Sequence, residues 1–143
     1  MTGVLDSFAV PSEEQAVLPA VERVLAAVRA AGYLEGEATP LKVALVELLR
    51  NAMEHGNRFV PQREVAVTVA CERERIAVTV ADEGPGLDPA RLAQSLSEQA
   101  PLEAPRGRGL GMVRRLLGEQ AAIEVCGSAI TIRFGRERFA RGR

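Results

Sequence analysis

Asp82, Gly84 and Gly86 are the residues of this 143-residue chain whose types and spacing point most directly to chemistry. They follow the alternating run Ile76–Ala81, and the alternation places Asp82 on the same face as the branched apolar residues of that run. A carboxylate at the end of a core-facing row needs a partner, because a buried charge is costly. The two glycines permit a sharp turn or a close approach to the backbone. Alone, the motif indicates either a turn-capping aspartate or a ligand site.

Glu47 and Asn51 form a second group, four residues apart in an expected helix. That spacing stacks them on one face. At about 100° per residue they lie beside the apolar stripe of the helix, where it meets the core or the edge of a cleft. The alternative is a boundary pair that hydrogen-bonds to neighbouring backbone.

The third group is Gly107-Arg108-Gly109-Leu110-Gly111, directly before an amphipathic segment. Alternate glycines leave backbone N–H groups unshielded, and the start of a helix adds the positive end of its dipole. This arrangement suits a phosphate group, although a flexible hinge has the same composition. The spacing differs from the dinucleotide-binding fingerprint.

Strands and helices expected from periodicity and capping signals must position these groups. Ser12 and Gln15 resemble a capping box, with Ser12 as the N-cap, and Thr39 is expected to cap a second helix with Pro40 at its first position. In chain order, we expect a strand at Val4–Val10, a helix to about Ala31, a loop at Glu35–Thr39, a helix to about His55, hairpin strands at Val65–Cys71 and Arg75–Ala81, a short helix from Asp88-Pro89, a mobile loop at Gln94–Arg106, a helix at about Gly109–Leu117, and a closing hairpin of Ala122–Cys126 and Ala129–Phe134.

Length and composition predict one domain over residues 1–143, with its core at about 8–135 and a short basic tail at 136–143. The net charge of −1 gives no electrostatic case for direct binding of nucleic acid. We see no apolar run of membrane-spanning length and no signal peptide, so we expect a cytoplasmic protein without a membrane partner. Cys71 and Cys126 are expected to be reduced thiols, and one histidine makes a zinc site improbable.

Taken together and in this order, the groups resemble the GHKL ATPases over about Phe8–Phe134. Glu47-x-x-x-Asn51 resembles the N box of that family, and Asp82-x-Gly84-x-Gly86 and Gly107–Gly111 resemble its two glycine boxes. The spelling Asn51-Ala52-Met53-Glu54-His55-Gly56-Asn57 is closest to the small bacterial anti-sigma factor kinases. No phospho-accepting histidine helix precedes the domain, so we do not expect a complete sensor histidine kinase.

The resemblance implies an α+β fold, the two-layer α/β sandwich called the Bergerat fold, with helices on one face of a mixed, mostly antiparallel sheet. It also implies an ATP site with Mg²⁺. In that site Asp82 would accept a hydrogen bond from the adenine amine, Asn51 would coordinate Mg²⁺, and Glu47 would be the general base. The remaining implied ATP-binding residues are Gly84, Gly86, Gly107, Arg108, Gly109, Leu110, Gly111 and Ser128. A solvated lid position is the alternative for Arg108, and a structural role is expected for His55.

The implied function is an ATP-binding anti-sigma factor with serine/threonine-protein kinase activity. Such a protein sequesters a sigma factor and phosphorylates an anti-anti-sigma (STAS-domain) antagonist, usually as a homodimer. Two alternatives stay open: a non-catalytic module that uses ATP only as a conformational ligand, and a switch kinase that acts on scaffold STAS proteins. The chain departs from the family pattern where Gly118-Glu119 follows Leu116-Leu117 and where Ser128 replaces the usual threonine.

Overall fold

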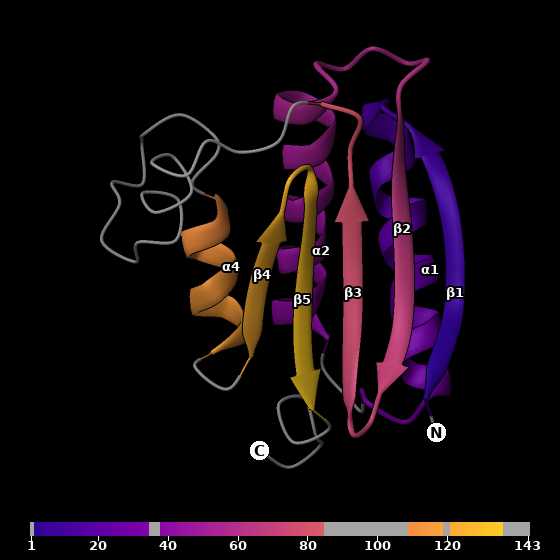
Figure 1. The fold of residues 1–143 in the computed structure, drawn as a ribbon, viewed down its shortest axis with the longest axis vertical. Helices are drawn as coiled ribbons and strands as arrows, with labels where there is room; N and C mark the ends of the chain where they lie inside the picture. Colours follow the sequence, from indigo (N-terminus) through magenta and orange to yellow (C-terminus); the bar gives the residue numbers. More distant parts are fainter. Residues whose placement is uncertain (1, 35–37, 85–108, 119–120, 136–143) are drawn as a thin grey trace.

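The computed structural model describes residues 2–34, 38–84, 109–118 and 121–135, which form one sheet with helices on one face (Figure 1). The strands are β1 (Gly3–Pro11), β2 (Glu64–Glu72), β3 (Arg75–Ala81), β4 (Ala122–Cys126) and β5 (Ala129–Gly135). The helical elements are the 3₁₀ turn η1 (Glu14–Ala16), α1 (Val17–Ala30), α2 (Thr39–Asn51), the π-helical turn η2 (Ala52–Gly56) and α4 (Gly109–Leu117). The expected α+β two-layer sandwich is confirmed.

The sheet has the strand order β1-β2-β3-β5-β4, which places β3 in its middle. We expected a mixed, mostly antiparallel sheet, whereas every strand pair of the described residues is antiparallel. Val78 of β3 lies opposite Val69 of β2 and Ile132 of β5, so the branched residues of three strands form one continuous apolar surface. The register follows from the alternation, because a slip of one residue would turn this surface to solvent.

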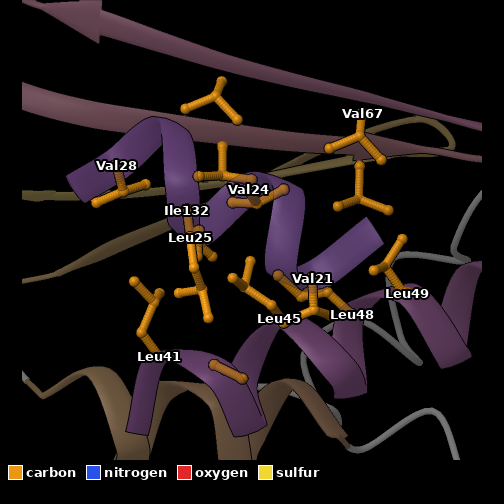
Figure 2. Close-up of a cluster of buried hydrophobic side chains, with 14 of the residues drawn as sticks. Val21, Val24, Leu25, Val28, Leu41, Leu45, Leu48, Leu49, Val67 and Ile132 are labelled. Carbon is orange, nitrogen blue, oxygen red and sulfur yellow. The ribbon is translucent and has the colours of Figure 1, made fainter. Parts of the chain in front are cut away.

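The core lies between that surface and the helices, and α2 packs between α1 and α4. Figure 2 shows the side chains of α1 and α2 together with Val67 and Ile132 of the sheet. Both helices bury the apolar stripes expected from their 3.6-residue period. The buried apolar residues of α1 and α2 are Val17, Ala20, Val21, Val24, Leu25, Val28, Leu41, Ala44, Leu45, Leu48 and Leu49.

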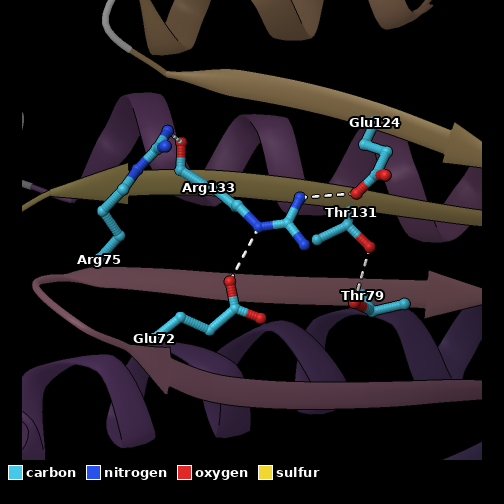
Figure 3. A network of polar contacts seen from close by, with 6 residues as sticks. All are labelled: Glu72, Arg75, Thr79, Glu124, Thr131 and Arg133. Atoms are coloured by element: carbon cyan, nitrogen blue, oxygen red, sulfur yellow. Dashed lines mark hydrogen bonds and ion pairs between the residues drawn. The ribbon is translucent and has the colours of Figure 1, made fainter. Parts of the chain in front are cut away.

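The opposite face of the sheet carries a polar network that spans four strands (Figure 3). Arg133 of β5 donates hydrogen bonds to Glu72 of β2 at 2.9 Å and to Glu124 of β4 at 2.7 Å. Thr79 and Thr131, which are paired in the register of β3 and β5, join their hydroxyls at 2.8 Å. These contacts are partly exposed, so they help to fix the register more than they stabilise the fold.

Two of the expected helix caps are wrong. Ser12 caps no helix, because its hydroxyl donates to the Arg63 carbonyl at 2.7 Å, and Gln15 reaches Glu13 instead of closing a capping box. Helix α2 begins at Thr39, with Ala38 as the N-cap residue. At Ser12 the local capping signal competes with a tertiary contact to Arg63, which the three-residue spacing of Ser12 and Gln15 does not report.

Some expected elements lie outside the described residues: the short helix from Asp88-Pro89, the loop Gln94–Arg106, the basic tail 136–143 and residues 35–37 of the loop Glu35–Thr39. The helix expected at Gly109–Leu117 is confirmed as α4, and the expected hairpin strands agree with β2 to β5 within one residue at each end. Within the described ranges, no helix is both long enough and apolar enough to cross a lipid bilayer.

Phe134 tests the packing of this sheet on its helices, because it is the largest fully buried side chain in the described ranges. We expect Phe134→Ala to lower the free energy of unfolding by about 3–5 kcal/mol, as measured by urea denaturation. Leu18→Ala is the matched control, since Leu18 is 56% exposed in α1 and its loss should change stability by at most about 0.5 kcal/mol. Similar losses in both variants would contradict this placement of the core.

Candidate nucleotide-binding site

Four segments that carry predicted site residues meet at one end of the sandwich, the upper end in Figure 1. They are the C-terminal end of α2 with η2, the end of β3, the turn between β4 and β5, and the N-terminal end of α4. The antiparallel sheet produces this meeting, because β3 ends at the edge where β5 begins. The fold therefore brings together residues that are up to 81 positions apart, from Glu47 to Ser128.

Asp82 directly follows β3, and its backbone continues the hydrogen bonding of β3 to the turn between β4 and β5. Its N–H donates to the Ser128 carbonyl at 3.1 Å, which places Ser128 beside it through the main chain. The carboxylate is half-buried, and its Oδ1 accepts the Gly84 N–H at 2.7 Å. Among the described residues, Oδ2 has no hydrogen-bond donor. Burial raises the pKa of Asp82 above its ordinary value, and the hydrogen bond from Gly84 opposes part of this shift.

Gly56 and Gly84 allow the end of η2 to lie directly against this turn. A Cβ atom added at Gly56 would overlap the Asp82 carboxylate, and one added at Gly84 would overlap the Gly56 carbonyl. The backbone of η2 is thus in van der Waals contact with the carboxylate on one side and with the turn on the other. Gly84 is a predicted site residue, whereas Gly56 belongs to the motif Asn51–Asn57 and has no predicted role of its own.

Asn51 is the last residue of α2 and is 8% exposed. Its Oδ1 atom is buried and has no hydrogen-bond partner among the described residues. Such an acceptor is unusual, because an unsatisfied buried polar group costs about 1–3 kcal/mol. Glu47 lies one helical turn before Asn51 and is partly exposed, so the two side chains share a face at the boundary of the core as predicted.

The helix that carries Asn51 changes its hydrogen bonding directly after this residue. Residues Ala52–Gly56 form a single π-helical turn, closed by a bond of 2.9 Å from the Asn57 N–H to the Ala52 carbonyl. Turns of this kind occur frequently at functional sites. The widened turn carries the chain to Gly56 and Asp82, and periodicity alone did not predict it.

The first turn of α4 contains three predicted phosphate-binding residues, Gly109, Leu110 and Gly111. The first four N–H groups of a helix have no partner within it, so this end suits an anion. The Leu110 side chain is buried in the core, which anchors the turn. Gly86, Gly107 and Arg108 lie outside the described residues, so their predicted roles stay predictions.

Comparison with known proteins identifies the family and the fold of this chain. The sequence model of the histidine kinase-like ATPase domain matches residues 10–134, most of the chain. This chain belongs to that family. No curated protein is significantly similar in sequence.

The solved structures most informative about this histidine kinase-like ATPase domain are those of histidine kinases. The mycobacterial sensor histidine kinase MprB is 19% identical with a TM-score of 0.57, and the match covers 91% of this chain and 97% of that one. The nucleotide-free catalytic domain of histidine kinase ThkA is 15% identical with a TM-score of 0.59, covering 92% and 97%. Full-length ShkA in complex with AMPPNP is 20% identical with a TM-score of 0.51, covering 92% of this chain and 31% of ShkA. The TM-scores show a shared fold, and at identities of 15–20% they show the fold alone.

Domains of this family bind ATP, usually with Mg²⁺, and the residues present fit both groups. The unpaired Asn51 oxygen is the kind of hard ligand that Mg²⁺ takes, as one protein ligand beside phosphates and waters. The Asp82 carboxylate has an oxygen to spare for an exocyclic amine. Sequence reasoning missed two contributors, Gly56 and Asn57, because their importance lies in contacts across the fold and no periodic signal marks them.

The raised pKa of Asp82 predicts how its replacement depends on pH. Between the ordinary value of 3.8 and the higher native value, the folded protein holds a proton that the unfolded chain has released, so this group lowers stability as pH rises through that window. Asp82→Asn removes the effect. The free energy of unfolding of the variant, relative to wild type, should therefore increase as pH rises above the ordinary pKa of 3.8 in urea titrations.

Asp6→Asn is a control of opposite sign. The hydrogen bond from Arg23 holds the pKa of Asp6 below its ordinary value, so its replacement should become more destabilising as pH rises. A flat or falling profile for Asp82→Asn would show that the native environment does not disfavour the Asp82 carboxylate.

Proposed function

We propose that this protein is an ATP-binding anti-sigma factor with serine/threonine-protein kinase activity, which sequesters a sigma factor and phosphorylates a STAS-domain antagonist. The observation that carries the catalytic part is the placement of Glu47 one turn before Asn51, whose buried oxygen has no partner within the part of the chain that the structure describes. Family membership supports the ATP-dependent part. The likeness of Glu47–Asn57 and Asp82–Gly86 to anti-sigma factor kinases supports the choice of partners.

ATP binding follows from three contacts that the described residues offer. Asp82 Oδ2 would accept the adenine amine, Asn51 Oδ1 would coordinate Mg²⁺, and the N–H groups at the start of α4 would face the phosphates. When bound, Mg²⁺ neutralises charge on the phosphates. That ShkA was solved with AMPPNP is in keeping with this assignment.

Phosphoryl transfer would then need a positioned hydroxyl and a base. In the proposed reaction a serine or threonine hydroxyl of the antagonist attacks the γ-phosphorus and gives its proton to Glu47. The bond from the γ-phosphorus to the bridging oxygen breaks, and ADP leaves with that oxygen. Most of the acceleration comes from positioning and charge neutralisation, so the base affects the rate of transfer more than the affinity for nucleotide.

Nucleotide binding is tested by replacing the two side chains that would contact adenine and Mg²⁺. We expect Asp82→Asn and Asn51→Ala each to weaken Mg-ATP binding by about ten- to a hundredfold in isothermal titration calorimetry, the effect of one charge-assisted contact. Asn51→Ala should not lower the free energy of unfolding by more than about 1 kcal/mol, because the lost oxygen has no partner among the described residues. Unchanged affinity in both variants would remove the site assignment.

The base is tested separately with Glu47→Ala. This variant should bind Mg-ATP as wild type does and lose at least about a hundredfold in transfer of radiolabelled γ-phosphate to the cognate antagonist. Glu22→Ala is the matched control, because Glu22 is an exposed α1 carboxylate that pairs with Lys42 at 3.4 Å. A wild-type protein that binds Mg-ATP and the sigma factor yet transfers no phosphate would instead support the non-catalytic binding module. Transfer without any sigma factor binding would support the switch kinase.

A further inference from the structure

Asn57 stands at the centre of a polar network at the base of the candidate site, in which Asn57 and Ser12 are buried. Its side chain is 0% exposed, and its amide makes three hydrogen bonds to three other segments. Oδ1 accepts the Glu83 N–H at 2.7 Å, and Nδ2 donates to the Ser12 hydroxyl at 2.8 Å and to the Glu64 carbonyl at 3.1 Å. These contacts join the end of η2 to the ends of β1 and β3 and to the start of β2.

The orientation of this amide is determined by its partners. The Glu83 N–H can only donate and the Glu64 carbonyl can only accept, so a flipped amide would lose both bonds. Both N–H donors of Nδ2 are used, and the Ser12 hydroxyl in turn donates a hydrogen bond to the Arg63 carbonyl at 2.7 Å. A fully satisfied buried network of this kind rigidifies the segments that it joins.

The segment that Asn57 holds is the turn with the Asp82 carboxylate. Glu83 lies between Asp82 and Gly84, which are joined by the hydrogen bond from the Gly84 N–H to the Asp82 carboxylate. The hydrogen bond from the Glu83 N–H to Asn57 therefore holds the whole turn in place. A second link runs parallel to it, from the Glu64 N–H to the Glu83 carboxylate at 2.5 Å. Beneath the turn lies Gly56, the residue before Asn57, and it leaves no space for the carboxylate to shift inward.

Asn57 also ends the helix that carries Asn51. Its own N–H closes the π-helical turn on the Ala52 carbonyl at 2.9 Å, directly after Asn51. One residue therefore ties the end of α2 to the turn after β3.

We infer that Asn57 is a positioning residue that holds the Asp82 carboxylate where it selects purines bearing a 6-amino group. This inference rests on the proposed adenine-binding role of Asp82. The bond from Glu83 N–H to Asn57 Oδ1 is the decisive contact, whereas the two bonds of Nδ2 anchor the amide to the ends of β1 and β2.

Nucleotide selectivity separates positioning from general stability. The probes are ATP and purine riboside triphosphate, which lacks the 6-amino group. We expect wild type to prefer ATP by about tenfold or more, and Asn57→Ala to bring the ratio of the two dissociation constants towards one at a temperature where it is fully folded. An unchanged ratio in folded Asn57→Ala would overturn the inference.

Two further variants keep the test valid if Asn57→Ala does not fold. Ser12→Ala removes one anchor and leaves the bond to Glu83, so selectivity should stay within about twofold of wild type while stability falls. Asn57→Asp keeps an acceptor for the Glu83 N–H and loses both donors, so it should be less stable and still selective. Selectivity that falls in step with stability across these variants would instead indicate a merely structural role.

A readout without nucleotide separates this inference from the proposed function. In the free protein, we expect hydrogen exchange at the Glu83 amide to be at least about tenfold faster in Asn57→Ala than in wild type, beyond any acceleration at β3 amides such as that of Val78, which report the loss of global stability. If wild type binds both nucleotides equally and Asn57→Ala still exposes the Glu83 amide to exchange, only the adenine role of Asp82 is contradicted. An unchanged Glu83 amide would contradict the positioning role of Asn57 alone.

Discussion

The contact between Gly56 and the turn Asp82–Gly84 is the constraint on which the rest of the site depends. There is no space for a side chain at Gly56 or at Gly84, so the end of η2 and the turn after β3 contact each other through their backbones. Because this contact is made between polar backbone groups and a carboxylate, it requires nearby hydrogen bonds, and Asn57 and Gly84 supply them. The contact fixes the distance between the helix that carries Asn51 and the strand that presents Asp82, which is the distance that a ligand spanning both would have to match.

The sandwich supplies the rigidity that such a contact needs. Helix α2 is packed between α1 and α4 on the apolar face of the sheet, so its C-terminal end cannot shift without disturbing the whole core. On the other face, Arg133 and its two glutamate partners join strands across the sheet (Figure 3). The antiparallel order then brings the end of β3, the β4–β5 turn and the start of α4 to one edge. A site on the ends of packed elements is held more firmly than one built on loops alone.

Two oxygen atoms at this edge are held in unfavourable surroundings. The Asp82 carboxylate loses water on folding, which raises its pKa, and the Asn51 oxygen is buried without a partner among the described residues. Neither arrangement stabilises the fold by itself. Both become favourable when an amine donor or a cation arrives, which is why they support the proposed binding of Mg-ATP.

The sequence by itself determined the elements and the order of the motifs. Alternation predicted the strands and their buried faces, the 3.6-residue period predicted the stripes of α1 and α2, and the spacing of Glu47 and Asn51 placed them on one helix face. These features are local, so a short window of residues contains the physical cause. Only the tertiary structure decided the all-antiparallel pairing of the described strands, the π-helical turn after Asn51, and the use of Ser12 in a buried network instead of a helix cap. Those outcomes depend on contacts between segments dozens of residues apart, such as Ser12 with Asn57 and Asn57 with Glu83. A local sequence pattern does not contain the identity of a hydrogen-bond partner that is distant along the chain.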